Sequence, residues 1–342
     1  MNIIAAAARL AERAPVPDSL SLLGVSYLVG RTRRRLARES EDAETRFVRD
    51  MRERAIAEHT DAANAQHYEL PSEFFGLALG PQRKYSSCFY PKGTETLAQA
   101  EEHALVQTIA HADLADGQRI LELGCGWGSL TLAMAERFPE ARIVAVSNSR
   151  SQRAHIMGEA ARRALSNVEV VTADMNVFEA NATFDRIVSV EMFEHMSNWD
   201  SLLSRARRWL APEGRLFLHV FTHRNRPYRF ETDDREDWIA QHFFTGGIMP
   251  SHGLITHFAD HFSLEREWRW SGAHYERTAL QWLENFDAHR DEIAGLMRAT
   301  YGADHAIWMR RWRLFFLATA GLFGHRGGEE WGVSHYLLKP AP

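Results

Sequence analysis

Three side chains that can hold or exchange protons lie in one short segment in the middle of the chain. Glu191 and Glu194 are three residues apart, and His195 follows directly. An imidazole titrates near neutral pH, and two carboxylates can bind a cation or orient the ring. The spacing lets both carboxylates face one cavity if the segment forms a helical turn. The alternative is a carboxylate pair that only caps the next helix.

A glycine-rich turn forms a second candidate site upstream. Gly124 and Gly126 follow a short apolar segment that contains Glu122. Such a turn lets a ligand approach the backbone closely, and dinucleotide-binding enzymes use it for this purpose. A dinucleotide cofactor would also need an acidic residue about 20 positions later for its ribose. Here Asn148 stands at the end of the next apolar segment, with Gln152 following. This argues against a dinucleotide cofactor.

Asp174 and Met175 follow the third apolar segment. A carboxylate at this position can accept a hydrogen bond from the exocyclic amine of an adenine, and an apolar neighbour can cover the ring. The alternative for Asp174 is a helix N-cap.

Alternating strands and helices must position these residues. Short apolar segments separated by helical ones predict a parallel sheet covered on both faces, so that residues after the strands share one edge. The expected strands are 119–123, 141–146, 168–172, 184–190, 215–221, 265–271 and 331–339. The expected helices are 40–63, 129–138, 151–164, 199–210, 277–290 and 306–322.

The chain divides into two predicted parts. Residues 1–80 form a helical N-terminal region, and residues 81–342 form the main domain. Within the latter, an irregular and aromatic stretch at about 222–262 is expected to be an insertion that caps the substrate site. The basic cluster at 31–38 fits a solvated helix face better than a surface for anionic lipid or nucleic acid.

Bulk composition excludes several classes. The 342 residues carry a net charge of −5, which gives no support for nucleic-acid binding. The most apolar run, 19–30, is shorter than the roughly 20 residues of a membrane span. Cys88 and Cys125 are the two cysteines, too few for a disulfide framework and wrongly spaced for a metal, so we expect no metal and a cytoplasmic location.

The motifs taken together resemble a known family. The segments that carry the likeness are Gln66–Pro71, Lys84–Tyr90, Leu121–Gly128, Ser147–Ser149 with Gln152, Val190–Met196, Arg311–Phe315 and Gly328–Tyr336. Together they resemble the cyclopropane-fatty-acid-synthase superfamily of S-adenosylmethionine (SAM)-dependent methyltransferases, and within it the coclaurine N-methyltransferase branch. The resemblance implies a Rossmann-like class I α/β fold, with a seven-stranded, mostly parallel sheet and helices on both faces.

The resemblance also assigns roles to residues. It places Tyr85 and Ser86 near the methionine and sulfonium end of SAM, with Glu122, Gly124 and Gly126 at the turn. Asn148 and Gln152 then bind the ribose, and Asp174 and Met175 the adenine. Glu191, Glu194 and His195 are implied to be catalytic, with His195 as base or proton shuttle. The substrate pocket is expected to contain Cys88, Phe221, Tyr275, Trp312 and Phe315.

The methyl acceptor stays open at this stage. A small amine, aromatic or alkaloid-like, is the first hypothesis. The second is methylation or cyclopropanation of an unsaturated fatty acyl phospholipid, for which related enzymes use a bound bicarbonate. Leu132 is taken to stand where those enzymes have a histidine, which argues against the lipid reaction. The third hypothesis is a cofactor-binding module without activity. The expected partner is a small-molecule substrate, with no nucleic acid and no stable membrane insertion; a homodimer is kept as an open alternative.

Overall fold

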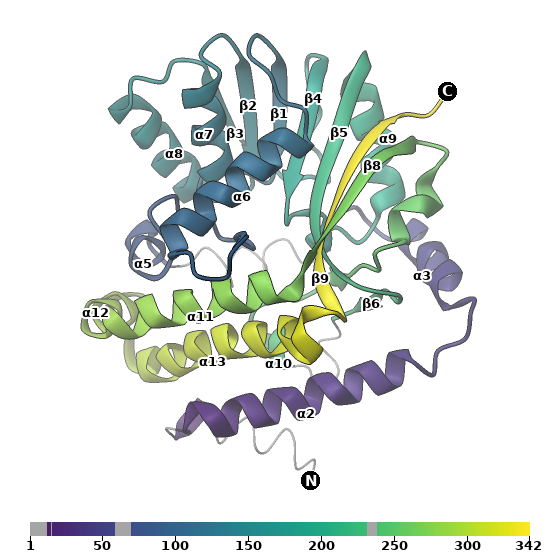
Figure 1. The fold of residues 1–342 in the computed structure, drawn as a ribbon. Coiled ribbons are helices and arrows are strands. Elements are labelled where there is room, and N and C mark those ends of the chain that lie inside the picture. The colour runs from purple at the N-terminus through teal and green to yellow at the C-terminus, as the bar shows by residue number, and fades with distance from the viewer. Residues whose placement is uncertain (1–11, 15, 59–69, 231–237) are drawn as a thin grey trace.

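A single seven-stranded sheet organises the chain (Figure 1). The computed structural model describes residues 12–14, 16–58, 70–230 and 238–342. The strand order is β3-β2-β1-β4-β5-β9-β8; the first five pair in parallel, and β9 is antiparallel to both neighbours. The bounds are β1 Arg119–Leu123, β2 Arg142–Ser147, β3 Val168–Thr172, β4 Phe184–Val190, β5 Leu210–His223, β8 Phe262–Ser271 and β9 Trp331–Pro340. The predicted Rossmann-like fold is confirmed.

Helices cover both faces because successive strand residues point to opposite sides. Ile120 and Val188 pack under α6 (Leu97–His111) and α7 (Ser129–Arg137). Leu121 packs on the other face, toward α9 (Trp199–Trp209) and α3 (Ala43–Arg52). Helix α8 (Arg150–Arg162) lies on the α7 side and covers β2 and β3. The near-continuous apolar strands of the sequence are therefore buried on two sides.

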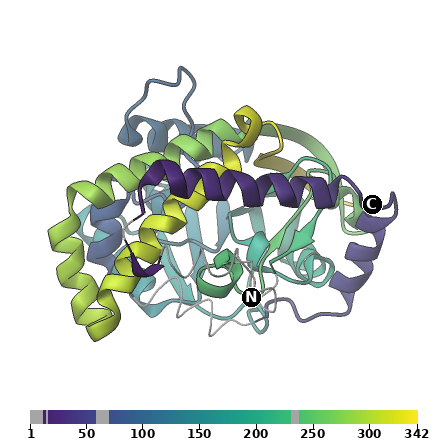
Figure 2. The ribbon, with the colours of Figure 1, turned by 90° about the horizontal axis from the view of Figure 1, so that it is seen from below.

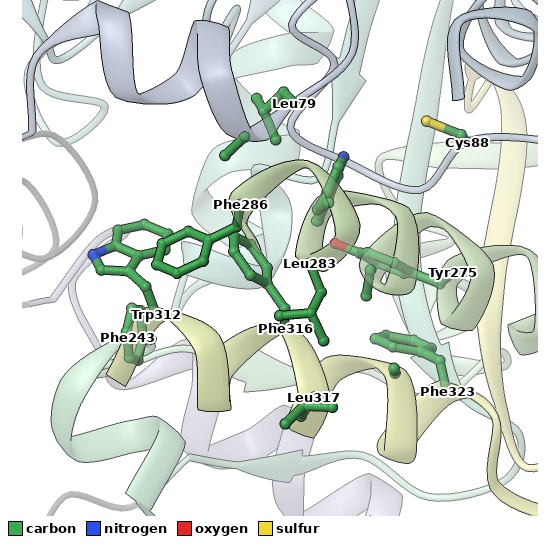
Figure 3. Packing of buried hydrophobic residues seen from close by; sticks show 14 of the residues in the cluster. Leu79, Cys88, Phe243, Tyr275, Leu283, Phe286, Trp312, Phe316, Leu317 and Phe323 are labelled. Carbon is green, nitrogen blue, oxygen red and sulfur yellow. The ribbon is translucent and has the colours of Figure 1, made fainter. Parts of the chain in front are cut away.

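A second layer of helices lies below the carboxyl edge of the sheet (Figure 1). It contains α11 (Gly272–Ala288), α12 (Arg290–Tyr301) and α13 (His305–Phe323), joined by the short α5 (Ser72–Ala78). Helix α2 (Asp18–Leu36) runs across α13 on the outside (Figure 2). The side chains between α11 and α13 are large and aromatic, among them Phe286 and Phe316 (Figure 3).

The segment between β5 and β8 contains only short elements. These are β6 (Tyr228–Arg229), α10 (Trp238–His242), β7 (Ile248–Met249) and the 3-10 helix η2 (Leu254–Phe258). Strands β6 and β7 form a separate antiparallel pair. Residues 231–237 of the expected insertion lie outside the described ranges. Within those ranges, no helix has the length and apolar character needed to span a membrane.

Several expected elements differ from those of the structure. The helix expected at 40–63 ends at Arg52, because the backbone of Ile56 and Ala57 instead pairs with the segment at 196–198. Residues 59–63 of this expected helix lie outside the described ranges, and so do residues 66–69 of the motif Gln66–Pro71. Strand β5 begins at Leu210, so Pro212 and Gly214 do not precede it. Helices α6 and α12 were not predicted at all.

Candidate active site

One cavity opens at the carboxyl edge of the sheet, where the predicted residues converge. Gly124 follows β1, Asn148 follows β2 and Asp174 follows β3, and all three line it. Parallel strands bring their ends to one edge, which explains the convergence. The predicted cofactor residues in the cavity wall are Tyr85, Ser86, Glu122, Gly124, Gly126, Asn148, Gln152, Asp174 and Met175.

The glycine turn has backbone angles that favour glycine. Gly124 has φ +79°, and a Cβ there would lie 2.5 Å from the side chain of Met192. Gly126 has φ +51°, and a Cβ there would meet no atom within 4 Å. Gly124 is therefore required by packing, whereas Gly126 leaves open space beside the cavity.

Gln152 carries a hydrogen-bond donor with no protein partner. Its Oε1 accepts a hydrogen bond from Ser147 Oγ at 2.6 Å, and its backbone amide caps α8 through Ser149 Oγ at 3.3 Å. The side chain is buried, yet Nε2 has no hydrogen-bond partner. Buried polar groups are almost always paired. A hydroxyl of a bound ligand would satisfy this donor.

Asp174 does not act as a helix N-cap. Its Oδ1 accepts a hydrogen bond from the Asn176 amide at 2.7 Å, which closes a turn, and the residues after it form turns and not a helix. The Asn176 side chain in turn pairs with the backbone of Ala57. The turn thus fixes Asp174 and Met175 in the cavity wall.

Glu122 is a buried carboxyl at the base of the cavity. Thr131 Oγ1 donates a hydrogen bond to its Oε2 at 2.5 Å. Burial raises the pKa of Glu122 to about 7, and the bond from Thr131 partly offsets this rise. Glu122 therefore titrates near neutral pH, so a cation bound beside it would favour its ionised form.

Glu191 is held as an acceptor by three donors. Ser87 N and His219 Nε2 contact its Oε1 at 2.9 and 3.2 Å, and Tyr275 Oη donates to its Oε2 at 2.7 Å. Its backbone has φ +48°, a conformation uncommon for a residue with a side chain. Its amide donates to the His219 carbonyl at 2.8 Å, which fixes this conformation. Strain of this kind clusters at functional sites.

The other two predicted catalytic residues lie on the 3-10 helix η1 (Phe193–His195). Glu194 is fully buried, and its Oε1 accepts a hydrogen bond from the Phe221 amide at 2.6 Å while Oε2 has no partner. His195 lines the cavity, with its ring 4.4 Å from that of Phe244. The expectation that both glutamates face one cavity was wrong: Glu191 precedes the helix, and Glu194 points at the β5 backbone.

The two buried carboxyls do not share the same electrostatic surroundings. Burial raises the pKa of both, and each disfavours the charged form of the other. The Lys84 ammonium, Ser87 and Tyr275 counter this rise at Glu191. At Glu194, burial and the charge of Glu191 raise the pKa more than the backbone hydrogen bonds lower it, so its pKa lies well above the usual range. Of the two carboxyls, Glu191 therefore favours the ionised form and Glu194 the protonated form.

The far half of the cavity is apolar. Phe221 from β5 and Phe315 from α13 line it, together with Tyr275 from α11. The remaining apolar side chains in this half are Phe230, Ile239, Phe244, Met249, Leu322 and Phe323.

Two residues predicted for the substrate pocket lie elsewhere. Trp312 is 1% exposed, and its ring packs 4.7 Å from Phe74 and 5.1 Å from Phe243 (Figure 3). Cys88 is fully buried beside Thr278, and burial raises the pKa of its thiol to about 12. Their placement in the pocket wall was wrong, because the α13 turn that points Phe315 into the cavity points Trp312 into the core.

Among the site residues that sequence reasoning missed, Lys84 and His219 bear on the charge of Glu191. Lys84 is buried in the cavity wall, and its Nζ donates to Ser86 Oγ at 2.5 Å and to the Ser87 carbonyl at 2.6 Å. His219 is buried in β5 and contacts Glu191. Its position as the one polar residue within the apolar run 216–221 was the available signal. Leu132, in contrast, is buried against α8 and does not line the cavity, so it carries no argument about the acceptor.

A match to protein-family models covers residues 56–327, and the matching family is described as Mycolic acid cyclopropane synthetase. The chain belongs to this family. It is 36% identical over 298 residues to (S)-coclaurine N-methyltransferase of Thalictrum flavum subsp. glaucum, covering 86% of this chain and 82% of that protein. It is 32% identical to cyclopropane-fatty-acyl-phospholipid synthase of Escherichia coli (strain K12), covering 78% of this chain and 66% of that protein.

A solved structure confirms the class. Coclaurine N-methyltransferase bound to N-methylheliamine and S-adenosylhomocysteine (SAH) matches with a TM-score of 0.93 at 33% identity, covering 97% of this chain and 98% of that one. This family member is therefore a SAM-dependent methyltransferase, and the predictions of its family and cofactor are confirmed.

Glu122 predicts how cofactor binding depends on pH. SAM carries positive charge, so its binding favours the ionised carboxylate. A group with a pKa of about 7 in the free protein must then lose its proton on binding. We expect the Kd for SAM to fall about tenfold between pH 6 and pH 8. Isothermal titration calorimetry measures this. In Glu122→Gln the dependence should flatten, and an equal slope in both proteins would refute the role of Glu122.

Phe315 and Trp312 give a matched pair of variants on one helix. Phe315→Leu removes an aromatic face from the cavity, so KM for a cationic substrate should rise about 2- to 30-fold, the range of a cation–π contact. Trp312→Ala should leave KM within about twofold but lower the free energy of unfolding by about 3–5 kcal/mol. Steady-state kinetics and urea titrations separate the two effects. The reverse pattern would contradict the placement.

Proposed function

We propose that the protein transfers the methyl group of SAM to the nitrogen of a small amine that carries an aromatic ring. The observation that carries this proposal is one continuous cavity with the glycine turn at one end, Glu191 and His195 beside it, and an aromatic wall at the other end. The names of similar proteins, (S)-coclaurine and pavine N-methyltransferase, support an amine acceptor.

The residues around the glycine turn fit the cofactor, which supplies an electrophilic methyl group on a sulfonium. The unpaired Nε2 of Gln152 suits a ribose hydroxyl, and Asn148 lies next to it in the wall. Asp174 and Met175 suit the adenine. Gly126 leaves the room that the backbone approach needs. Tyr85 and Ser86 close the end nearest the acceptor.

On the acceptor side, the protein must supply position and a place for a proton. Only the neutral amine has the lone pair that attacks a methyl group, and amines are largely protonated near neutral pH. The ionised Glu191 attracts the ammonium, and His195 accepts or relays its proton. Glu194, protonated and bonded to Phe221, positions the turn that holds them. Alignment of the lone pair supplies much of the remaining rate.

The segment between β5 and β8 serves as the cap over the acceptor. Phe230, Ile239, Phe244 and Met249 all come from this segment and line the cavity. Their apolar surface excludes water and suits an aromatic ring. This supports the insertion at about 222–262, which we place within a methyltransferase domain at 81–342 that follows an N-terminal helical region at 1–80.

A mass-shift screen tests the proposal. The protein and SAM are incubated with secondary and tertiary aromatic amines and, in parallel, with vesicles of unsaturated phospholipid plus bicarbonate. We expect one added methyl group on an amine and none on the lipid. Turnover of the vesicles alone would establish the lipid reaction instead. Calorimetric SAH binding without turnover of any substrate would support a module without activity.

The two cysteines bear on the location of the enzyme. Both cysteines are free and buried, which fits a reducing compartment, so we propose a cytoplasmic enzyme. Light scattering of the purified chain distinguishes a monomer from the homodimer that the sequence leaves open.

A further inference from the structure

Three histidines connect Glu191 to the surface of the molecule, and the proposed function assigns no role to any of them. His219 on β5 and His335 on β9 are both fully buried. His111 ends α6 and is half-buried. The three residues are far apart in the sequence, so only the fold brings them together.

The sheet places these rings in one row. His219 pairs with His335 across β5 and β9, and His335 pairs with Trp268 across β9 and β8. Paired residues in a sheet point to the same face. The ring of His111 comes from α6 above this face and stacks on Trp268 at 3.8 Å with an interplanar angle of 5°.

The ring nitrogens form a continuous hydrogen-bonded chain. His219 Nε2 lies 3.2 Å from Glu191 Oε1, and His219 Nδ1 lies 2.9 Å from His335 Nε2. His335 Nδ1 lies 2.8 Å from His111 Nδ1. His219 and His335 thus each use both ring nitrogens. A neutral imidazole has one donor and one acceptor nitrogen, so fixing one ring fixes its neighbours.

The charge of Glu191 selects the direction of the chain. An ionised carboxylate can only accept, so His219 must donate from Nε2. Its Nδ1 then accepts from His335 Nε2, and His335 Nδ1 accepts from His111 Nδ1. We propose that His219, His335 and His111 are positioning residues whose tautomers are locked with every N–H directed toward Glu191, so that the surface imidazole of His111 helps to hold the carboxylate ionised. This deepens the proposed function, because the ionised Glu191 is the group that attracts the substrate ammonium there.

The surrounding charges are compatible with neutral rings. Burial lowers the pKa of His219 and His335 far below the usual range, and the nearby Lys84 adds to this. Burial, with Arg266 on β8, lowers the pKa of His111 to about 4. Glu191 itself also faces Lys84, Tyr275, Glu194 and His219. All three rings are therefore neutral around pH 7. The hydrogen bonds that link them then decide which nitrogen of each ring carries the proton.

Nuclear magnetic resonance of ¹⁵N-histidine-labelled protein tests the lock without any substrate. A neutral histidine in water favours the Nε2–H tautomer, whereas the proposed hydrogen bond from His111 to His335 requires Nδ1–H at His111. We expect Nδ1–H at His111 in the native protein and a return toward Nε2–H in His335→Leu and in Glu191→Leu. His305, whose Nδ1 contacts the Gly302 carbonyl at 2.9 Å, serves as an internal control that should not change. Nε2–H at His111 in the native protein would overturn the proposal.

Kinetics on an accepted amine then test the effect on Glu191. His111→Phe keeps the stack on Trp268 but removes both nitrogens. We expect kcat to fall about 2- to 10-fold, the effect of one lost hydrogen bond, with KM within about twofold. The acidic limb of the kcat/KM profile should move to higher pH, because the carboxylate loses support. His111→Gln, which can still donate to His335, should restore most of both. If His111→Phe and His111→Gln behaved alike, the proposed role of the three histidines would be refuted, while methylation of the amine by the native protein would still stand.

Discussion

Glu191→Gln is expected to lower kcat/KM for an amine substrate by about 30- to 5,000-fold, because removing one partner of a buried charge pair costs about 2–5 kcal/mol. The amide keeps the shape of the side chain but not its charge. The amide also replaces one acceptor oxygen with an NH2 donor, and this donor would face one of the donors from Ser87, His219 and Tyr275. The Kd for SAH, measured by calorimetry, should stay within about threefold, since the cofactor wall is separate. Equal losses of turnover and cofactor binding would remove the catalytic assignment.

Glu194→Gln is the matched control for this variant. Because Glu194 is protonated and bonded to the Phe221 amide, a neutral amide replaces it closely. We therefore expect less than about a fivefold change in kcat/KM. A loss as large as that of Glu191→Gln would mean that Glu194 carries the charge and that the roles of the two carboxyls are reversed.

Gly126→Leu is expected to weaken SAH binding by about 100-fold or more. The new side chain would extend into open space beside the cavity, where the cofactor is proposed to lie. The residue also has φ +51°, so a side chain adds about 1–2 kcal/mol of backbone strain. Calorimetry with SAH measures the binding, and urea titration measures the free energy of unfolding.

Gly117→Leu separates backbone strain from the loss of cofactor space. Gly117 has φ +76°, and a Cβ there would also meet no atom within 4 Å, but it lies in the turn before β1 and does not line the cavity. We expect a similar loss of stability and an unchanged Kd for SAH. Parallel losses of binding in both variants would show that the effect of Gly126→Leu is a general destabilisation.

Much of the fold followed from local pattern. Apolar segments of strand length, separated by helices, specify a parallel sheet, and all seven expected strands are present. The errors occur where distant contacts override local preference. The helix expected at 40–63 ends early because the backbone after Arg52 pairs with the segment following β4. Propensity alone does not contain such a contact.

The sequence by itself determined the class of cofactor and the edge of the sheet that binds it, because the glycine turn and the strand ends are local features that parallel pairing brings together. It did not separate Phe315 from Trp312, since helical phase against a neighbouring layer decides which aromatic side chain reaches the cavity. Nor did it reveal the row from Glu191 through His219 and His335 to His111. That row depends on strand register and on the packing of α6, and both exist only once the whole chain has folded.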